Sequence, residues 1–168
     1  MGMYPVILLN GPSSSGKSTL ARALQALIRR EGGGDYGIVS IDDYLPMEKD
    51  RPIYEEDVYA VSAALCERAA ALAAERDGAI LDHVITSGRI FAQTMERLGA
   101  GWVALVRVTC PPAVLRRREQ ARGDRCAGSA EASAHYLYPQ EGYDVTVDTA
   151  ACTAEECARK ILGALAEM

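Results

Sequence analysis

The sequence has 168 residues, 49% of them apolar, and a formal net charge of −5. This size and apolar content predict one domain over residues 1–168, and the negative charge argues against nucleic-acid or membrane-surface binding, which depends on a positive field. No apolar run is long enough to cross a membrane and no signal peptide is recognised, so we expect a cytoplasmic protein.

The first feature along the chain is the apolar run 6–9, which leads into a serine-rich turn bounded by Gly11 and Gly16. The turn fits the phosphate-binding pattern G-x-x-x-x-G-K-[ST]. The glycines allow successive backbone N–H groups to converge on a phosphate, and the next helix points its positive end there. A chance match in an ordinary turn is the alternative, disfavoured by the strand before and the helix after the pattern.

This P-loop predicts a nucleoside triphosphate and Mg²⁺ as cofactors. Lys17 supplies a point charge for the β- and γ-phosphates, and the Ser18 hydroxyl is a hard oxygen ligand for Mg²⁺. The residues expected to bind the nucleotide here are Gly11, Ser13, Ser14, Ser15, Gly16, Lys17, Ser18 and Thr19.

Further elements follow from apolar periodicity and from glycine and proline breakers. In chain order they are helix 18–30, strand 36–41, loop 45–56, helix 57–76, strand 79–81, helix 88–98, strand 102–109, helix 111–122, strand 143–147 and helix 153–165. Short apolar strands alternating with helices predict an α/β fold, a three-layer P-loop-type sandwich with a mostly parallel five-stranded sheet. In such sheets ligands bind at the carboxyl ends of the strands.

Two acids follow predicted strands at that edge. Asp42 is placed to act as a general base for an acceptor hydroxyl, and Asp82 to hold the Mg²⁺ shell or to orient the acceptor. Asp43 competes with Asp42 for either role, and each acid alternatively caps the turn that follows it. His83 either contacts the substrate or is a hydrogen-bonded structural group.

One short block of the chain is rich in arginine. Arg118 and Arg122 share a helix face, and Arg125 follows a glycine hinge. We expect an Arg-rich lid that clamps the triphosphate and excludes water. The alternative is a solvated helix face on which the arginines pair with Glu119 and Asp124.

The acceptor side of the site is predicted to be loop 45–56. Acids outnumber basic residues between positions 43 and 60, and tyrosines flank the segment. These residues favour a small, partly apolar acceptor that is neutral or cationic.

Several motifs together resemble the chloramphenicol phosphotransferase family of P-loop kinases over nearly the whole chain. They are I-L-L-N-G-P-S-S-S-G-K-S, V-S-I-D, I-L-D-H-V, R-E-Q-A-R-G-D-R-C-A-G and E-G-Y-D-V-T-V-D-T. The resemblance implies transfer of the γ-phosphate of ATP to a small-molecule hydroxyl, with chloramphenicol or another antibiotic as the acceptor. It implies Asp42 as the base, Lys17 and Arg125 as further catalytic residues, and Arg118 and Arg122 at the nucleotide.

Two features keep other functions open. Segment 43–56 is shorter than in the chloramphenicol-modifying enzyme, and Asp82-His83 stands where two acids are expected. The alternatives are a kinase of a metabolite or nucleotide-sugar, or a nucleotide-sensing module without transfer. For the kinase we expect a small-molecule hydroxyl acceptor, with no nucleic-acid or membrane partner.

Overall fold

The computed structural model describes residues 4–99 and 102–168, in which five strands form one sheet. The strands are β1 (Val6–Asn10), β2 (Tyr36–Ser40), β3 (Gly78–His83), β4 (Val103–Thr109) and β5 (Val145–Asp148). Their order across the sheet is β2-β3-β1-β4-β5, and every neighbouring pair is parallel. The sheet is therefore wholly parallel, where the sequence predicted a mostly parallel one.

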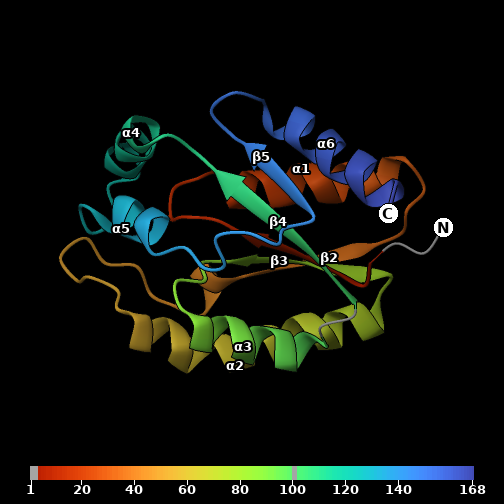
Figure 1. Cartoon of the computed structure of the whole chain (residues 1–168), viewed down its shortest axis with the longest axis horizontal. Helices are drawn as coiled ribbons and strands as arrows, with labels where there is room; N and C mark the ends of the chain where they lie inside the picture. The colour runs from red at the N-terminus through yellow and green to blue at the C-terminus, as the bar shows by residue number, and fades with distance from the viewer. Residues whose placement is uncertain (1–3, 100–101) are drawn as a thin grey trace.

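In the described part of the chain, six α-helices surround this sheet. They are α1 (Lys17–Arg30), α2 (Glu55–Glu75), α3 (Gly88–Leu98), α4 (Pro112–Arg122), α5 (Ser129–His135) and α6 (Ala154–Ala166). Helices α1 and α6 cover one face and α2 and α3 the other, while α4 and α5 lie beyond the carboxyl end of β4 (Figure 1). The predicted three-layer α/β sandwich is confirmed.

The core is divided between the two faces of the sheet. In β1 all five residues are buried, with Ile7 and Leu9 packed in the cluster that includes α1 and α6, and Leu8 in the cluster on the α2 side. A strand covered on both faces has no solvent side, which explains an apolar run without alternation. This packing fixes the position of the P-loop at the end of β1.

Several local details differ from the sequence prediction. Helix α2 starts at Glu55, two residues earlier than predicted, and β3 extends to His83, so that Asp82 lies within the strand. Strand β2 ends at Ser40, and Ile41–Asp43 forms a single 3₁₀ turn named η1. Strand β5 starts later than expected, at Val145. Helix α5 was not predicted at all. Among the described residues, no helix is long and apolar enough to cross a membrane.

Candidate active site

The P-loop leaves the central strand β1 and closes onto the start of α1. A side chain at Gly11 would place its Cβ 2.6 Å from the carbonyl oxygen of Val108 on β4, so only glycine fits there. Gly16 has a φ of +88°, and Ser14 also adopts a left-handed φ of +65°. Such a conformation costs a non-glycine residue on the order of 1 kcal/mol or more, and it is typical of functional loops. The backbone is thus shaped as a concave anion cradle.

Lys17 lies beneath this cradle. Its ammonium donates a hydrogen bond to the carbonyl oxygen of Pro12 at 2.8 Å and lies 3.8 Å from Oδ1 of Asp82. Burial lowers the pKa of Lys17, and the nearby carboxylate of Asp82 opposes that shift. The Lys17 ammonium is therefore held at a fixed position inside the loop and is shielded from solvent.

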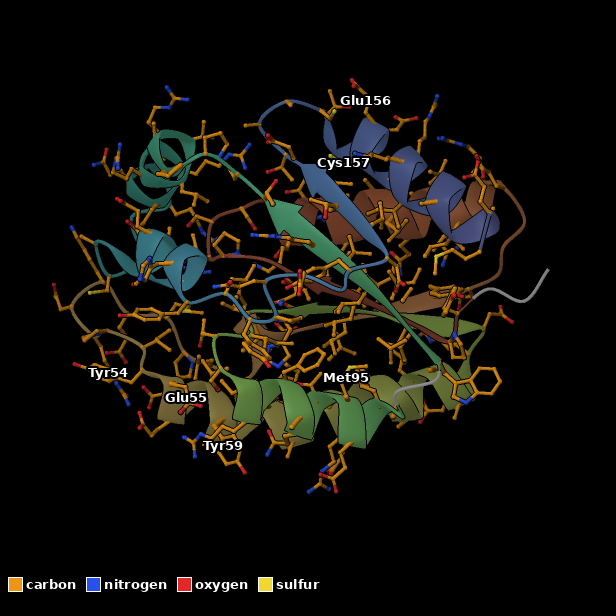
Figure 2. The ribbon with its side chains drawn as sticks, in the orientation of Figure 1. Tyr54, Glu55, Tyr59, Met95, Glu156 and Cys157 are labelled. Atoms are coloured by element: carbon orange, nitrogen blue, oxygen red, sulfur yellow. The ribbon has the colours of Figure 1, made fainter. Side chains whose placement is uncertain are left out.

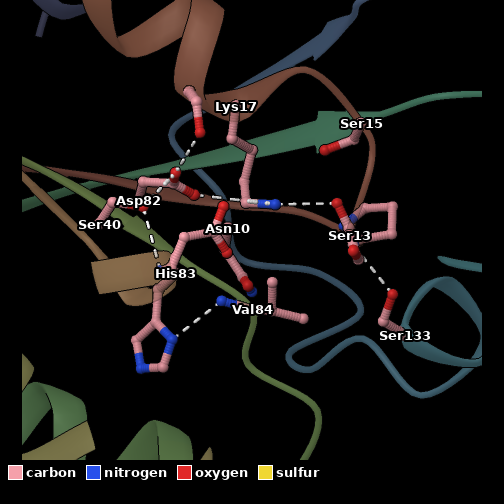
Figure 3. Close-up of polar contacts among 12 residues, drawn as sticks. Asn10, Ser13, Ser15, Lys17, Ser40, Asp82, His83, Val84 and Ser133 are labelled. Atoms are coloured by element: carbon pink, nitrogen blue, oxygen red, sulfur yellow. Dashed lines mark hydrogen bonds and ion pairs between the residues drawn. The ribbon is translucent and has the colours of Figure 1, made fainter. Parts of the chain in front are cut away.

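Asp82, on β3, binds polar groups from two other elements, α1 and β2. Its Oδ2 accepts hydrogen bonds from the hydroxyls of Ser18 at 3.1 Å and Ser40 at 2.9 Å (Figure 3). Burial raises the pKa of Asp82, and the charge of Lys17 counteracts this. These hard oxygens suit Mg²⁺, which takes one or two protein ligands together with phosphate oxygens and water. Within the described residues, no group of three or more His, Cys, Asp or Glu side chains is placed to hold a metal ion.

Asp42 lies in η1, directly after β2. The backbone N–H of Asp42 donates a hydrogen bond to the Ser40 hydroxyl at 3.3 Å, which fixes the turn. Arg125 donates from Nη2 to Oδ2 of Asp42 at 3.1 Å, and Arg122 lies 3.7 Å from the same oxygen. The carboxylate is therefore held between two arginines of the segment that the sequence identified as a lid.

The third arginine of that segment contacts the P-loop directly. Arg118 donates from Nη1 to the carbonyl oxygen of Ser15 at 3.1 Å and to Oγ1 of Thr149 at 3.0 Å. It thereby connects the cradle to the loop that follows β5. Thr149 was not identified from the sequence, since a threonine after a short strand carries no distinctive signal.

One alternative had the lid arginines paired with Glu119. The structure contradicts it, because the Glu119 carboxylate binds backbone N–H groups instead. Glu119 is buried, and its carboxylate accepts hydrogen bonds from the N–H groups of Gly128 at 3.1 Å and Ala130 at 2.9 Å. It thus caps the start of α5 from the neighbouring helix α4. Asp124 does pair as that alternative had it, with Arg122 at 3.7 Å and with Arg125 at 3.4 Å.

These groups surround a cleft of about 720 Å³ at the carboxyl ends of the strands. Most of the residues predicted from sequence line it: Ser13, Ser14, Gly16, Lys17, Ser18, Thr19, Asp42, Asp82, Arg118, Arg122 and Arg125. Gly11 and Ser15 do not, because Gly11 packs on β4 and the Ser15 side chain is buried. The structure therefore brings most of the predicted site residues together around one cleft, while Gly11 and Ser15 lie behind its wall.

A second cavity, of about 550 Å³, adjoins the first. Ser13 and Arg125 line both. Its wall comes from loop 45–54 and helix α5 and is largely apolar, and its rim carries Tyr54 and Tyr136, each 63% exposed. Tyr54 projects outward just before α2 (Figure 2). This cavity has the character of a site for a small, partly apolar molecule.

The charged groups of the second cavity are few. Glu55 is bound by Arg89 and accepts from the Ser87 hydroxyl at 2.6 Å, and these hydrogen bonds lower the pKa of Glu55 to about 2. Arg51 lies 3.9 Å from Asp57. The cationic side chains contacting the cavity thus already have acidic neighbours, which disfavours a strongly anionic guest.

His83 is a buried, hydrogen-bonded structural group and does not line either cavity. Its Nδ1 accepts from the backbone N–H of Val84 at 2.9 Å, so Nε2 carries the proton and donates to the Ser62 hydroxyl at 2.9 Å. Burial lowers the pKa of His83 to about 3, which keeps the ring neutral. Asp43 is exposed and lines neither cavity, unlike Asp42.

Asn10, at the end of β1, was missed by sequence reasoning. Its amide nitrogen donates to the carbonyl oxygen of Tyr138 at 2.9 Å and to the Tyr143 hydroxyl at 3.0 Å. Its Oδ1 accepts from the backbone N–H of Ile85 at 2.9 Å. The one available signal was a polar residue closing an otherwise apolar strand. Asn10 ties three segments together beside the P-loop.

Comparison with protein families gives a match over residues 5–166 to the model described as chloramphenicol phosphotransferase-like protein. Comparison with curated proteins gives no significant relative.

Solved structures with the same fold include several small-molecule kinases. A gluconokinase from Sinorhizobium meliloti 1021 has a TM-score of 0.72 and 24% identity, covering 98% of this chain and 94% of its own. The APS kinase of Mycobacterium tuberculosis, in complex with AMPPNP and APS, has a TM-score of 0.73 and 17% identity with full coverage of both chains. Shikimate kinase from Acinetobacter baumannii, in complex with shikimate, has a TM-score of 0.66 and 19% identity, covering 99% and 95%. The fold is that of P-loop kinases.

Proposed function

This chain belongs to the chloramphenicol phosphotransferase-like family, and on that premise we propose that it is an ATP-dependent O-phosphotransferase. It would move the γ-phosphate of ATP to a hydroxyl of a small molecule, with chloramphenicol or another antibiotic as the acceptor. The observation that carries this proposal is the position of Arg125, which lines both the larger cleft and the apolar cavity and donates a hydrogen bond to Asp42 in the cleft.

The proposed nucleotide site is the larger cleft. Backbone N–H groups from Gly16 to Thr19 would hold the phosphates, and Lys17 would bind the β- and γ-phosphate oxygens. Arg118 and Arg122 reach the same cleft from α4 and supply further positive charge. This arrangement concentrates positive charge where the transferred group becomes most negative.

Ser18 and Asp82 would hold Mg²⁺, with Asp82 acting directly or through water. The hydroxyl and the carboxylate oxygen are 3.1 Å apart and both face the cleft. When bound, the ion would neutralise phosphate charge. The protein itself supplies the oxygens and keeps them orientated through the Ser40 hydrogen bond.

Asp42 would orient the acceptor hydroxyl and accept its proton. Asp42 lines the cleft, and Arg125, which also lines the second cavity, holds its carboxylate in a defined direction. The acceptor would occupy the second cavity, whose apolar wall and paired charges suit a neutral molecule. Arg125, which contacts both spaces, would bridge the acceptor and the transferred phosphate.

The proposal is tested with purified protein, ATP and Mg²⁺ against a panel of hydroxyl compounds, measuring the product mass. The panel contains neutral antibiotics, including chloramphenicol, neutral metabolites, and phosphorylated or carboxylated compounds of similar size. We expect one added phosphate on a neutral, partly apolar member. Transfer only to anionic metabolites would favour a metabolic kinase, and ATP binding without any transfer would favour a nucleotide-sensing module.

A further inference from the structure

One planar peptide group of the P-loop is hydrogen-bonded at both ends. Its carbonyl oxygen, from Pro12, accepts from the Lys17 ammonium at 2.8 Å. Its N–H, from Ser13, donates to the hydroxyl of Ser133 on α5 at 3.0 Å (Figure 3). Because a trans peptide is rigid and its C=O and N–H point in opposite directions, fixing one end fixes the other.

We propose that Ser133 is a positioning residue for Lys17, acting through the Pro12–Ser13 peptide. The inference rests on the proposed function, since it assigns Lys17 to the nucleotide phosphates. By holding the Ser13 N–H, Ser133 keeps the Pro12 carbonyl pointed at the lysine. The ammonium then stays at the floor of the cradle, between that carbonyl and Asp82.

The Ser133 hydroxyl is itself fixed. It donates to the carbonyl oxygen of Ala130 at 2.9 Å, which leaves its lone pairs directed at the P-loop. Ala130 in turn donates its N–H to the buried carboxylate of Glu119 on α4. The peptide that holds Lys17 is therefore connected through α5 to the helix that carries the lid arginines.

Helix α5 also lines the second cavity, through Ala132 and Ser133. A molecule that fills this cavity would press on the same helix that holds the Ser13 N–H. The contact thus links the acceptor side of the site to the charge that binds the γ-phosphate.

The test is a double-mutant cycle on ATP affinity, which needs no acceptor. Calorimetric titration of ATP and Mg²⁺ compares the wild type, Ser133→Ala, Lys17→Ala and the double variant. Ser133→Ala should weaken ATP binding about three- to tenfold, the net effect of one hydrogen bond. In the Lys17→Ala background, Ser133→Ala should weaken ATP binding by less than about twofold, because the lysine that Ser133 positions is absent.

Two further variants separate positioning from general damage to α5. Ser133→Thr keeps a hydroxyl and should restore most of the affinity. Ser129→Ala, one turn earlier on the same helix, should leave ATP affinity within about twofold. An equal loss with and without Lys17, or an equal loss in Ser129→Ala, would overturn the positioning role. Absence of transfer by the wild type would instead overturn the proposed function, and the coupling would still be measured.

Discussion

Arg125 donates a hydrogen bond to Asp42 over 3.1 Å, joining the segment after α4 to the turn after β2. The two residues are 83 positions apart in sequence, and the guanidinium is buried while the carboxylate is partly open to the cleft. The contact therefore sets the direction of the proposed base from the lid side. Arg125 Nε is buried and has no hydrogen-bond partner among the described residues.

Replacing Arg125 by lysine should reduce phosphate transfer. A lysine keeps the charge but cannot bind Asp42 and a substrate oxygen with one planar group. We expect kcat to fall roughly 100-fold, in the range seen when one transition-state donor is lost. Arg116→Lys, which changes an exposed arginine paired with Glu131, is the matched control and should leave kcat nearly unchanged. Equal kcat values for the two variants would contradict the role of Arg125.

Glu119→Gln should loosen α5. The amide can accept from one of the two N–H groups that the carboxylate binds, so a buried donor is left unpaired at a cost of about 1–3 kcal/mol. Hydrogen exchange should accelerate in residues 128–135. Glu131→Gln, which removes only a surface ion pair, is the control and should change little. Unchanged exchange in Glu119→Gln would show that the cap does not hold the helix.

The sequence predicted the sheet and the P-loop because both depend on local patterns. Five apolar strands, the glycine-bounded turn and the acids at the strand ends can each be recognised within a few residues. Helix α5 could not be recognised in this way. It has seven residues, and its first turn is satisfied by Glu119, nine or more positions earlier.

The missed site residues share this long-range character. Ser133 meets the P-loop 120 positions away, and Thr149 meets Arg118 from the loop after β5. Nothing near them in sequence distinguishes these hydroxyls from other surface serines and threonines. His83 shows a related limit, because the sequence left substrate contact and a structural role equally open, and only its burial and its hydrogen bond to Ser62 on α2 distinguish them.

Tyr136→Ala should weaken acceptor binding without affecting the nucleotide. Tyr136 lies at the rim of the second cavity and packs edge-on against His135. Loss of its contact area should raise KM for the acceptor several-fold and leave KM for ATP within about twofold. Trp102→Ala is a control of the same kind, because this exposed aromatic precedes β4 at the opposite end of the strand from the cleft. A change in KM for ATP alone would place the acceptor elsewhere.

Stability should fall in mild acid because of His83. Above pH 6.5 the ring is neutral in both the folded and unfolded chain, and the full stability is present. Between pH 6.5 and about 3 the unfolded chain takes up a proton that the folded protein does not, because burial lowers the pKa of His83 to about 3. In this range, each unit by which the pH falls should therefore lower the unfolding free energy by about 1.4 kcal/mol.

The pH effect is checked by denaturant unfolding at several pH values. His83→Gln should show a flatter dependence on pH than the wild type below pH 6.5, whatever its stability at neutral pH. His135→Gln is the matched control, because that side chain is exposed. A wild-type slope retained in His83→Gln would show that another group causes the acid sensitivity.

The most direct test of the account compares Asp42→Asn with Asp43→Asn in transfer and in ATP binding. The two acids are adjacent, but only Asp42 lines the cleft and contacts Arg125. We predict that Asp42→Asn lowers transfer to the acceptor by roughly 10²–10⁴-fold while ATP affinity stays within about threefold, and that Asp43→Asn retains both. Undiminished transfer by Asp42→Asn would contradict the assignment of Asp42 as the base and, with it, the proposed mechanism.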